Sequence, residues 1–363
     1  VALADGNPYD KAQLAERARQ DRQRSSVHPF FYPPAFMNVM SWTPWFSLQT
    51  SYRIWFWLGE LAALAMLLAL CRWLRPLGPG VTPVAVVAFA LCSAVPNNHL
   101  MGQANFLMMV FTVLALWAES RGRSWTAGGL LGVAVLMKMS PALFILAWSV
   151  ERRWRAVGAS VVTYLFITLL TTGIWGVESS LYFYTEVLPG FGSGHYNGLR
   201  VPIQLFGNHS IPNLWHQLWP SEGAGLSEVS RWMSLGSSFL LLGVTLWPMR
   251  RPALTPLVSA ARWAGVAMVM LLIPVYTYEH HLIWALPAVV VSAFALAQGR
   301  YGAWGIAPLA LAWLGWGISL EKVKRLALSL FDGSNTWAFG WILQEWKWMA
   351  CMVCWLAMMF LVY

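Results

Sequence analysis

The stretch WTAGGLLGVAVLMKMSPALFILAW, residues 125–148, decides the fold. It is apolar over the length that one bilayer crossing needs, about 20 residues, but Lys138-Met139-Ser140-Pro141 interrupts it in the middle. A charge followed by a proline at this depth predicts a broken or re-entrant helix, because membranes tolerate such a gap where it lines a cavity. This stretch therefore indicates a polytopic membrane protein.

The composition of the whole chain agrees with a membrane protein. Of its 363 residues, 58% are hydrophobic and 11% are charged, whereas soluble domains carry about 25% charged residues. So few charges cannot cover a water-soluble globule. The same figures exclude disordered proteins and disulfide-stapled secreted domains. The four cysteines form no metal-ligand set and no phosphate-binding glycine motif is present, so we expect no metal and no cofactor.

Apolar segments recur along the chain. They fall at roughly 52–71, 82–97, 104–118, 125–148, 156–175, 232–248, 260–275, 281–298, 302–320 and 346–363. We therefore expect an all-α protein with about nine to eleven transmembrane or re-entrant helices. Residues 1–51 are expected to form a first extracytoplasmic loop, with a polar helix from Asp10 to Arg24, and residues 52–363 the transmembrane domain, with an outer loop at about 176–231.

Basic residues set the expected orientation. The net charge of +9 is explained first by the excess of lysine and arginine in cytoplasmic loops, rather than by nucleic-acid binding. One set of short loops holds Arg72, Arg75, Arg121, Arg123, Arg152, Arg153, Arg155, Arg250, Arg251 and Arg300. These loops share a face only if residues 125–148 return to the face they left. Most acidic residues and the long loops then lie outside, so we expect an extracytoplasmic site in a multi-pass protein of the cell membrane.

Lys138 is the costliest residue in this scheme. A lysine at membrane depth costs about 2.5–3.5 kcal/mol on insertion scales. Such a residue persists where it faces a polar cavity or binds an anion. Snorkelling to water from the mouth of a short helix is the alternative, but intramembrane charges usually mark functional sites.

Three further polar clusters fall on the expected outer side. Gln103 and Asn105 can bind sugar hydroxyls, although an N-cap for the next helix explains Asn105 equally well. Glu279 stands beside His280 and His281, and this group suits proton transfer, phosphate binding or an interfacial polar belt. The third cluster, in the long outer loop, comprises Arg200, Asn208 and His209.

Six short motifs together resemble glycosyltransferase family 87 over nearly the whole chain. They are Gly6-Asn7-Pro8-Tyr9-Asp10, Tyr32-Pro33-Pro34, Gly102-Gln103-Ala104-Asn105, Lys138 with Pro141, Gly207-Asn208-His209-Ser210, and His280-His281. Each motif is weak alone, but their shared order and spacing are fairly specific.

The resemblance implies a GT-C fold with a site on the extracytoplasmic face. It implies a polyprenyl-phosphate sugar donor, usually carrying mannose, and transfer with inversion onto a hydroxyl of a glycolipid or glycan. A lipid-linked donor also accounts for the missing nucleotide site. Cations such as Lys138 or Arg200 would stabilise the phosphate anion that leaves.

The resemblance also assigns roles to single residues. Lys138, Gln103, Asn105 and the two histidines are carried over as donor- or substrate-binding groups. A histidine is expected near the donor phosphate, and His280 is the first choice because it lies closer to the polar loop; Glu279, Asn208 and His209 rank after it. The family's base is an aspartate that follows a first transmembrane helix, so both are expected upstream of Val1. Without them the chain as given would be an inactive fragment.

A transporter or flippase of a lipid-linked sugar is the alternative function, because it too would use a broken helix and an intramembrane lysine.

Overall fold

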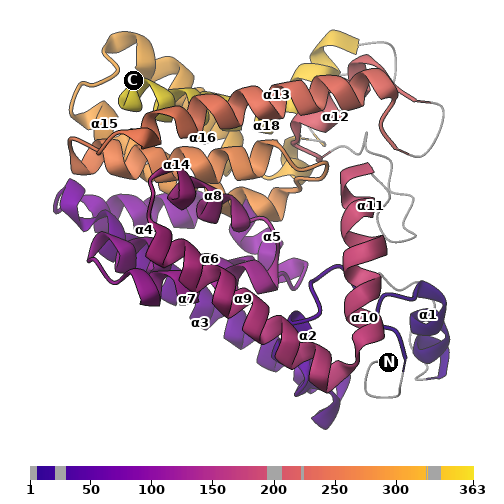
Figure 1. The fold of residues 1–363 in the computed structure, drawn as a ribbon. Coiled ribbons are helices and arrows are strands. Elements are labelled where there is room, and N and C mark those ends of the chain that lie inside the picture. The colour runs from indigo at the N-terminus through magenta and orange to yellow at the C-terminus, as the bar shows by residue number, and fades with distance from the viewer. Residues whose placement is uncertain (1–5, 21–29, 194–206, 222–224, 324, 326–336) are drawn as a thin grey trace.

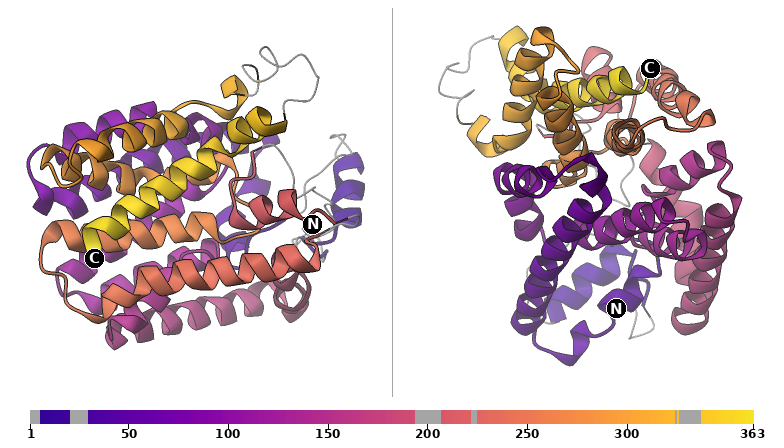
Figure 2. Two further views of the ribbon diagram at one scale, coloured as in Figure 1. Left: turned by 90° about the horizontal axis from the view of Figure 1, so that it is seen from above. Right: turned by 90° about the vertical axis from the view of Figure 1, so that its left-hand side faces the viewer.

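A computed structural model describes residues 6–20, 30–193, 207–221, 225–323, 325 and 337–363. Within these ranges all regular secondary structure is helical. Figure 1 shows helices α1, α10 and α11 at one end of the molecule and the C-terminus at the other, and Figure 2 shows the same separation of the termini from above. The chain is therefore an all-α protein, as predicted.

The first half of the chain contains the helices that surround the break at Lys138. Their bounds are α1 Lys11–Gln20, α2 Phe36–Met40, η2 Thr43–Trp45, α3 Leu48–Leu74, η3 Arg75–Leu77, α4 Val81–Leu91, α5 Ala94–Leu100, α6 Asn105–Ser120, α7 Ser124–Met137, α8 Ala142–Val150 and α9 Trp154–Trp175.

The second half supplies η6, the histidine segment, which carries His280 and His281. Its elements are α10 Val177–Tyr182, the π-helical turn η4 Phe183–Val187, α11 Leu188–Ser193, α12 Ile211–Leu218, α13 Glu228–Leu246, η5 Trp247–Arg250, α14 Pro256–Leu272, η6 Glu279–Ala285, α15 Leu286–Ala297, η7 Ala303–Gly305, α16 Ile306–Gly317 and α18 Trp337–Val362. The expected outer loop at 176–231 thus carries helices of its own.

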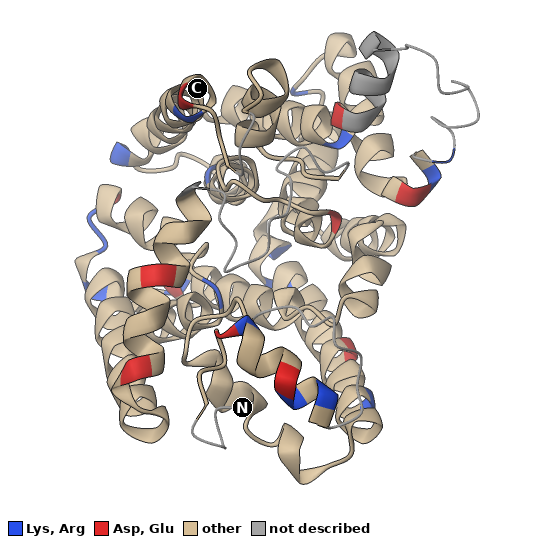
Figure 3. Ribbon diagram, turned by 90° about the vertical axis from the view of Figure 1, so that its right-hand side faces the viewer, with Lys and Arg blue, Asp and Glu red and all other residues tan. Residues whose placement is uncertain are grey.

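Five helical segments of the described chain are long and apolar enough to cross a membrane. They are Leu48–Leu77, Trp154–Trp175, Glu228–Arg250, Glu279–Ala297 and Glu345–Val362, and a sixth is formed if α4 and α5, bent by 56°, count as one span. Each apolar segment marked in the sequence corresponds to a helix or helix pair, but α6, α7 and α14 are shorter apolar helices. Figure 3 shows how sparsely charges are spread over these helices. The chain is a multi-pass membrane protein.

Residues 124–150 form the re-entrant hairpin that the sequence predicts. Helix α7 ends at Met137, and α8 begins after Pro141. Glu119, just before this hairpin, accepts a hydrogen bond from Arg153, just after it, at 2.9 Å. Both ends of the hairpin therefore lie on one face of the molecule. This face carries Arg121, Arg123, Arg152 and Arg153 and is named the arginine-bearing face.

Two glycines let α7 pack closely along α9. A Cβ atom on Gly128 would lie 2.3 Å from the carbonyl oxygen of Ala156, and one on Gly132 would lie 2.7 Å from that of Ser160. Gly128 faces Ala156, and Gly132, four residues later, faces Ser160, also four residues later. The two helices therefore run parallel, and both start at the arginine-bearing face. Small residues allow such close packing in membranes, where lipid provides no hydrophobic drive for helices to associate.

Helix α14 forms the centre of the core, whereas α9 lies at the periphery. Nearly every residue of α14 is buried, on all sides of the helix, which is typical of a helix enclosed by others. On α9, Leu165, Phe166 and Leu169 are exposed and suit contact with lipid tails. The core places η6, between α14 and α15, next to the break at Lys138.

Candidate functional site

The break between α7 and α8 brings Lys138 to the histidine segment. Lys138 is extended (φ −160°, ψ 137°) and so leaves the helical path after Met137. Its Nζ atom contacts Nε2 of His281, the third residue of η6. Two residues far apart in the sequence thus meet where the re-entrant hairpin turns.

The backbone of Tyr278 fixes the tautomer of His281. The Tyr278 N–H donates to Nδ1 of His281 at 3.0 Å, while the His281 N–H donates to the Tyr278 carbonyl at 2.9 Å. A ring nitrogen that accepts a hydrogen bond carries no proton, so the proton of the neutral imidazole lies on Nε2. His281 therefore presents an N–H donor to Lys138.

Lys138 and His281 form a pair of donors without an acceptor between them. An ammonium group has three N–H donors and no lone pair, and Nε2–H is also a donor. Two donors that lie side by side can both bind an anionic oxygen placed next to them, such as that of a phosphate or a carboxylate. Lys138 contacts the ring of His281, and the role of the adjacent His280, the first choice from the sequence, stays a prediction.

A pair of asparagines holds the backbone of His280. Asn98 donates through Nδ2 to the His280 carbonyl at 2.7 Å, and Asn105 donates to the same carbonyl at 3.2 Å and to Oδ1 of Asn98 at 2.8 Å. Both asparagines are buried. The described contacts of Asn105 therefore position the histidine segment, and its binding of substrate stays a prediction.

Gln103 links the site to the N-terminal segment. Its backbone N–H donates to the Asn98 carbonyl at 3.0 Å, and its Oε1 accepts from the hydroxyl of Tyr32 at 3.0 Å. The hydroxyl of Tyr9 donates in turn to the Tyr32 carbonyl at 2.8 Å. Burial raises the pKa of Tyr32 to about 12, so this hydroxyl keeps its proton and acts as a donor to Gln103 near neutral pH.

The loop before η6 is fixed by Asn208 and Ser210. Asn208 donates to the Val275 carbonyl at 2.9 Å and accepts from the Thr277 N–H at 2.9 Å. Ser210 also donates to the Val275 carbonyl, at 2.9 Å. Gly207 precedes them with φ +107°, and a Cβ atom there would lie 2.5 Å from Leu320. These contacts place the chain that leads into Tyr278 and the histidines.

His209 lies fully buried beside this loop. Its N–H donates to the Thr277 carbonyl at 2.7 Å, but neither ring nitrogen has a hydrogen-bond partner among the described residues. Burial, with a smaller effect of the nearby Lys347 charge, lowers the pKa of His209 to about 3. The ring is therefore neutral at physiological pH.

Glu279 forms a buried ion pair that fixes the start of η6. Its Oε1 lies 3.3 Å from Nζ of Lys347 and accepts from the Leu320 N–H at 3.0 Å. Lys347 also donates to the hydroxyl of Ser93 at 2.9 Å. Because both charges are nearly inaccessible to solvent, Glu279 joins α18 to the histidine segment, and its predicted contact with substrate stays a prediction.

Lys347 and Asn98 belong to this site although the sequence patterns did not indicate them. A signal for Lys347 was present: it is a cation within the apolar segment at 346–363, and such a charge needs a partner. Asn98 stands in the polar turn that also holds Gln103 and Asn105. Its role depends on a contact with His280, which no local pattern indicates.

One candidate cannot be placed near Lys138, because Arg200 lies outside the described residues. Asp10 caps α1, because its Oδ1 accepts from the N–H groups of Ala12 and Gln13 at 2.8 and 3.2 Å. The described part of the site therefore consists of binding and positioning groups.

The chain is similar to a known protein family and to named proteins of other organisms. Residues 30–274 match the model of glycosyltransferase family 87. A polyprenol-phosphate-mannose-dependent alpha-(1-2)-phosphatidylinositol mannoside mannosyltransferase of Mycolicibacterium smegmatis is 25% identical over 327 residues, which are 84% of this chain and 69% of the relative.

Two relatives from Mycobacterium tuberculosis are also similar. A protein of the same name is 25% identical over 199 residues, 54% of this chain and 43% of the relative. A polyprenol-phosphate-mannose-dependent alpha-(1-2)-phosphatidylinositol pentamannoside mannosyltransferase is 26% identical over 248 residues, 66% of this chain and 52% of the relative. The chain thus matches about half the length of these two relatives.

Proposed function

The chain belongs to glycosyltransferase family 87, and from this premise we propose that it is a membrane hexosyltransferase of the GT-C type. Its donor is a polyprenyl-phosphate sugar, with mannose as the sugar, and its acceptor is a hydroxyl of a glycolipid. The relatives named as polyprenol-phosphate-mannose-dependent mannosyltransferases support this donor, and their phosphatidylinositol mannoside acceptors support a glycolipid. The match to a transferase family favours this reaction over transport of a lipid-linked sugar.

The contact between Lys138 and His281 carries the proposal. An anionic oxygen next to these two adjacent donors would accept from both, and the donor's phosphate supplies such an oxygen. In the transfer, the bond between the anomeric carbon and the phosphate oxygen breaks, and the acceptor oxygen bonds to that carbon from the opposite side. The polyprenyl phosphate leaves as an anion, which these donors stabilise as its charge develops.

The acceptor hydroxyl loses its proton to a carboxylate base in this reaction. His280, Gln103 and Asn208 lie in the network around Lys138 and His281 and are proposed to shape the space for donor and acceptor.

The orientation of the site follows from the two faces of the molecule. The ends of α3, α6 and α8 carry arginines on the arginine-bearing face, which the positive-inside rule makes cytoplasmic. The histidine segment opens from the other side, next to the outer segments of Tyr32 and Asn208. We therefore place the reaction at the extracytoplasmic surface of the cell membrane.

Transfer of radiolabelled mannose from polyprenyl-phosphate mannose to phosphatidylinositol mannoside by the full-length gene product in vesicles tests this function. Lys138→Met should lower kcat/KM by about 100-fold or more, because one lost donor to developing charge costs that much. His281→Leu should do the same, whereas His281→Gln keeps an N–H donor and should retain part of the activity. Lys11→Met, at an exposed position on α1, is the matched control. Transfer by Lys138→Met and His281→Leu equal to that of the control would end the proposal.

A further inference from the structure

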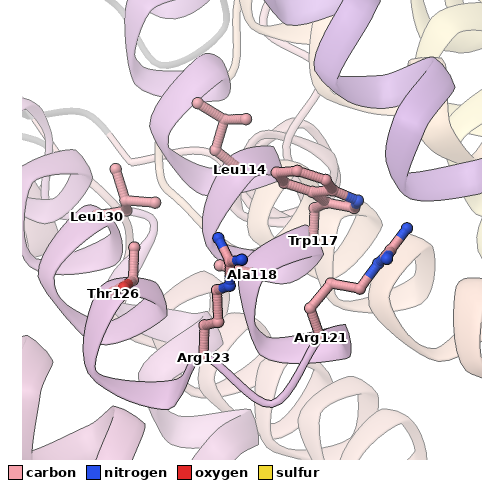
Figure 4. Close-up of a pocket in the computed structure, with 7 residues that line it drawn as sticks. All are labelled: Leu114, Trp117, Ala118, Arg121, Arg123, Thr126 and Leu130. Carbon is pink, nitrogen blue, oxygen red and sulfur yellow. The ribbon is translucent and has the colours of Figure 1, made fainter.

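A second site lies on the arginine-bearing face, away from the histidine segment. A cavity of about 430 Å³ opens between α6 and α7, and its lining includes Leu114, Trp117, Arg121, Arg123 and Leu130. Figure 4 shows the two leucines at one end of this cavity and the two arginines at the other. The cavity therefore has an apolar end and a cationic end.

A smaller cavity adjoins the first. It has a volume of about 290 Å³ and shares Trp117 and Arg121 with its neighbour, while Arg72 and Arg75 contribute from the end of α3. The guanidinium of Arg121 lies 5.7 Å from the centre of the Trp117 ring, within the range of a cation–π contact. Trp117 thus holds Arg121 at the boundary between the two cavities.

The four arginines have no acidic partner in the described part of the chain. No ion pair or side-chain hydrogen bond joins Arg72, Arg75, Arg121 or Arg123 to another described residue. The acidic side chain closest in sequence, Glu119, is already bonded to Arg153. Four cations next to two cavities therefore lack a counter-charge from the described protein.

The distance between the leucines and the arginines of the lining matches the distance between the acyl chains and the head group of a phospholipid. Leu114 and Leu130 are each seven residues from the nearer arginine on the same helix end, a rise of about 10 Å. Exposed Trp125 and Trp154 lie on the same face, where tryptophans mark the membrane interface. The arginines consequently sit at the level of lipid head groups, and the leucines at the level of acyl chains.

We propose that these two cavities bind an anionic phospholipid of the leaflet on the arginine-bearing face. A phosphate lies against Arg121 and Arg123, and an acyl chain lies along Leu114 and Leu130. Basic pockets between transmembrane helices on the cytoplasmic side recognise such head groups. Because the second cavity adds Arg72 and Arg75, a lipid with two phosphates, of the cardiolipin type, binds more tightly than one with a single phosphate.

Native mass spectrometry of the detergent-solubilised chain tests this site by titration with cardiolipin, phosphatidylglycerol and phosphatidylcholine. We expect affinities in that order. Arg121→Gln with Arg123→Gln should weaken cardiolipin binding by about 30-fold, since each arginine near the surface contributes about 1 kcal/mol and 1.4 kcal/mol is a factor of ten. Arg250→Gln with Arg251→Gln is the matched control, because both are exposed basic residues outside the cavities.

Three results would overturn the assignment. Equal binding of phosphatidylcholine and the two anionic lipids would remove the role of the arginines. An equal loss in the control double variant would leave only a general effect of surface charge. Binding of inorganic phosphate without lipid, abolished by Arg121→Gln with Arg123→Gln, would assign the cavities to a soluble anion instead. Transfer activity is a separate readout, so failure here leaves the proposed function standing.

Discussion

Removal of one partner from the Glu279–Lys347 pair should destabilise the protein more than removal of both. Lys347→Met leaves the Glu279 carboxylate buried without its counter-charge, and among the described residues the Leu320 N–H remains as its donor. Glu279→Gln leaves the Lys347 ammonium buried without a counter-charge, and its described acceptors are then two neutral groups, the Ser93 hydroxyl and the new amide oxygen. Each uncompensated charge costs about 3–5 kcal/mol.

The double variant Glu279→Gln with Lys347→Met removes both charges together. Glutamine keeps an oxygen that accepts from Leu320, so the backbone bond survives. We expect the double variant to lie within about 1 kcal/mol of the parent, because replacement of a whole buried pair is often neutral. The sum of the two single losses should therefore exceed the loss in the double variant by about 5 kcal/mol or more, and this difference is the coupling energy of the cycle.

The free energy of unfolding of the four proteins, measured by titration with denaturing detergent in mixed micelles, gives this coupling energy. The exposed Glu321–Arg325 pair is the control: its atoms are 3.2 Å apart, compared with 3.3 Å in the buried pair. Exposed pairs contribute about 0–1 kcal/mol, so its cycle should show little coupling. Additive losses in the Glu279–Lys347 cycle would refute the reasoning, because they would mean that the two side chains do not meet.

Three other outcomes follow from the described contacts. Gly128→Ala should cost about 1–3 kcal/mol of unfolding free energy by overpacking against α9. Gly129→Ala, whose nearest neighbour would be at 3.7 Å, should be neutral or stabilise the protein by up to about 1 kcal/mol. The buried imidazole of His209 has a pKa of about 3 and stays neutral in the folded protein, whereas the unfolded chain takes up a proton near the ordinary pKa of about 6.5. The free energy of unfolding should therefore fall by about 2 kcal/mol between pH 7 and pH 5. His209→Leu should remove this part of the pH dependence, and an unchanged pH dependence would contradict the burial. A cysteine replacing Gln103 should react with a membrane-impermeant thiol reagent from outside intact cells, and one replacing Arg153 only after permeabilisation; the reverse pattern would invert the orientation.

The re-entrant hairpin could be predicted because its signals lie in single residues. Lys138 interrupts an apolar run, and Pro141 ends any continuing helix. The arginines of the flanking loops then require both ends on one face. The ion pair between Glu119 and Arg153 confirms this inference. Two general properties are enough for this prediction: the free-energy cost of a charge within a membrane and the excess of basic residues in cytoplasmic loops.

The identity of the histidine at Lys138 could not be predicted in the same way. His280 and His281 are adjacent, and the sequence offers no measure of where each ring points. The choice is made by the 3₁₀ geometry of η6, which brings the ring of His281 back to the backbone of Tyr278, three residues earlier. The partnership of Glu279 with Lys347 was equally hidden, because it depends on how α18 packs against η6.

The depth of Lys138 connects the hairpin to the proposed chemistry. Helix α7 has 14 residues, so at 1.5 Å per residue it rises about 21 Å from the arginine-bearing face. In a hydrocarbon core about 30 Å thick, Lys138 therefore lies within about 10 Å of the opposite surface. In the proposed function, a polyprenyl chain held in the bilayer presents its phosphate near that surface, within reach of Lys138 and His281. If α7 continued across the membrane, the lysine would lie on a helix wall with neither Pro141 nor the turn to aim it at His281, and the pair of donors would not form.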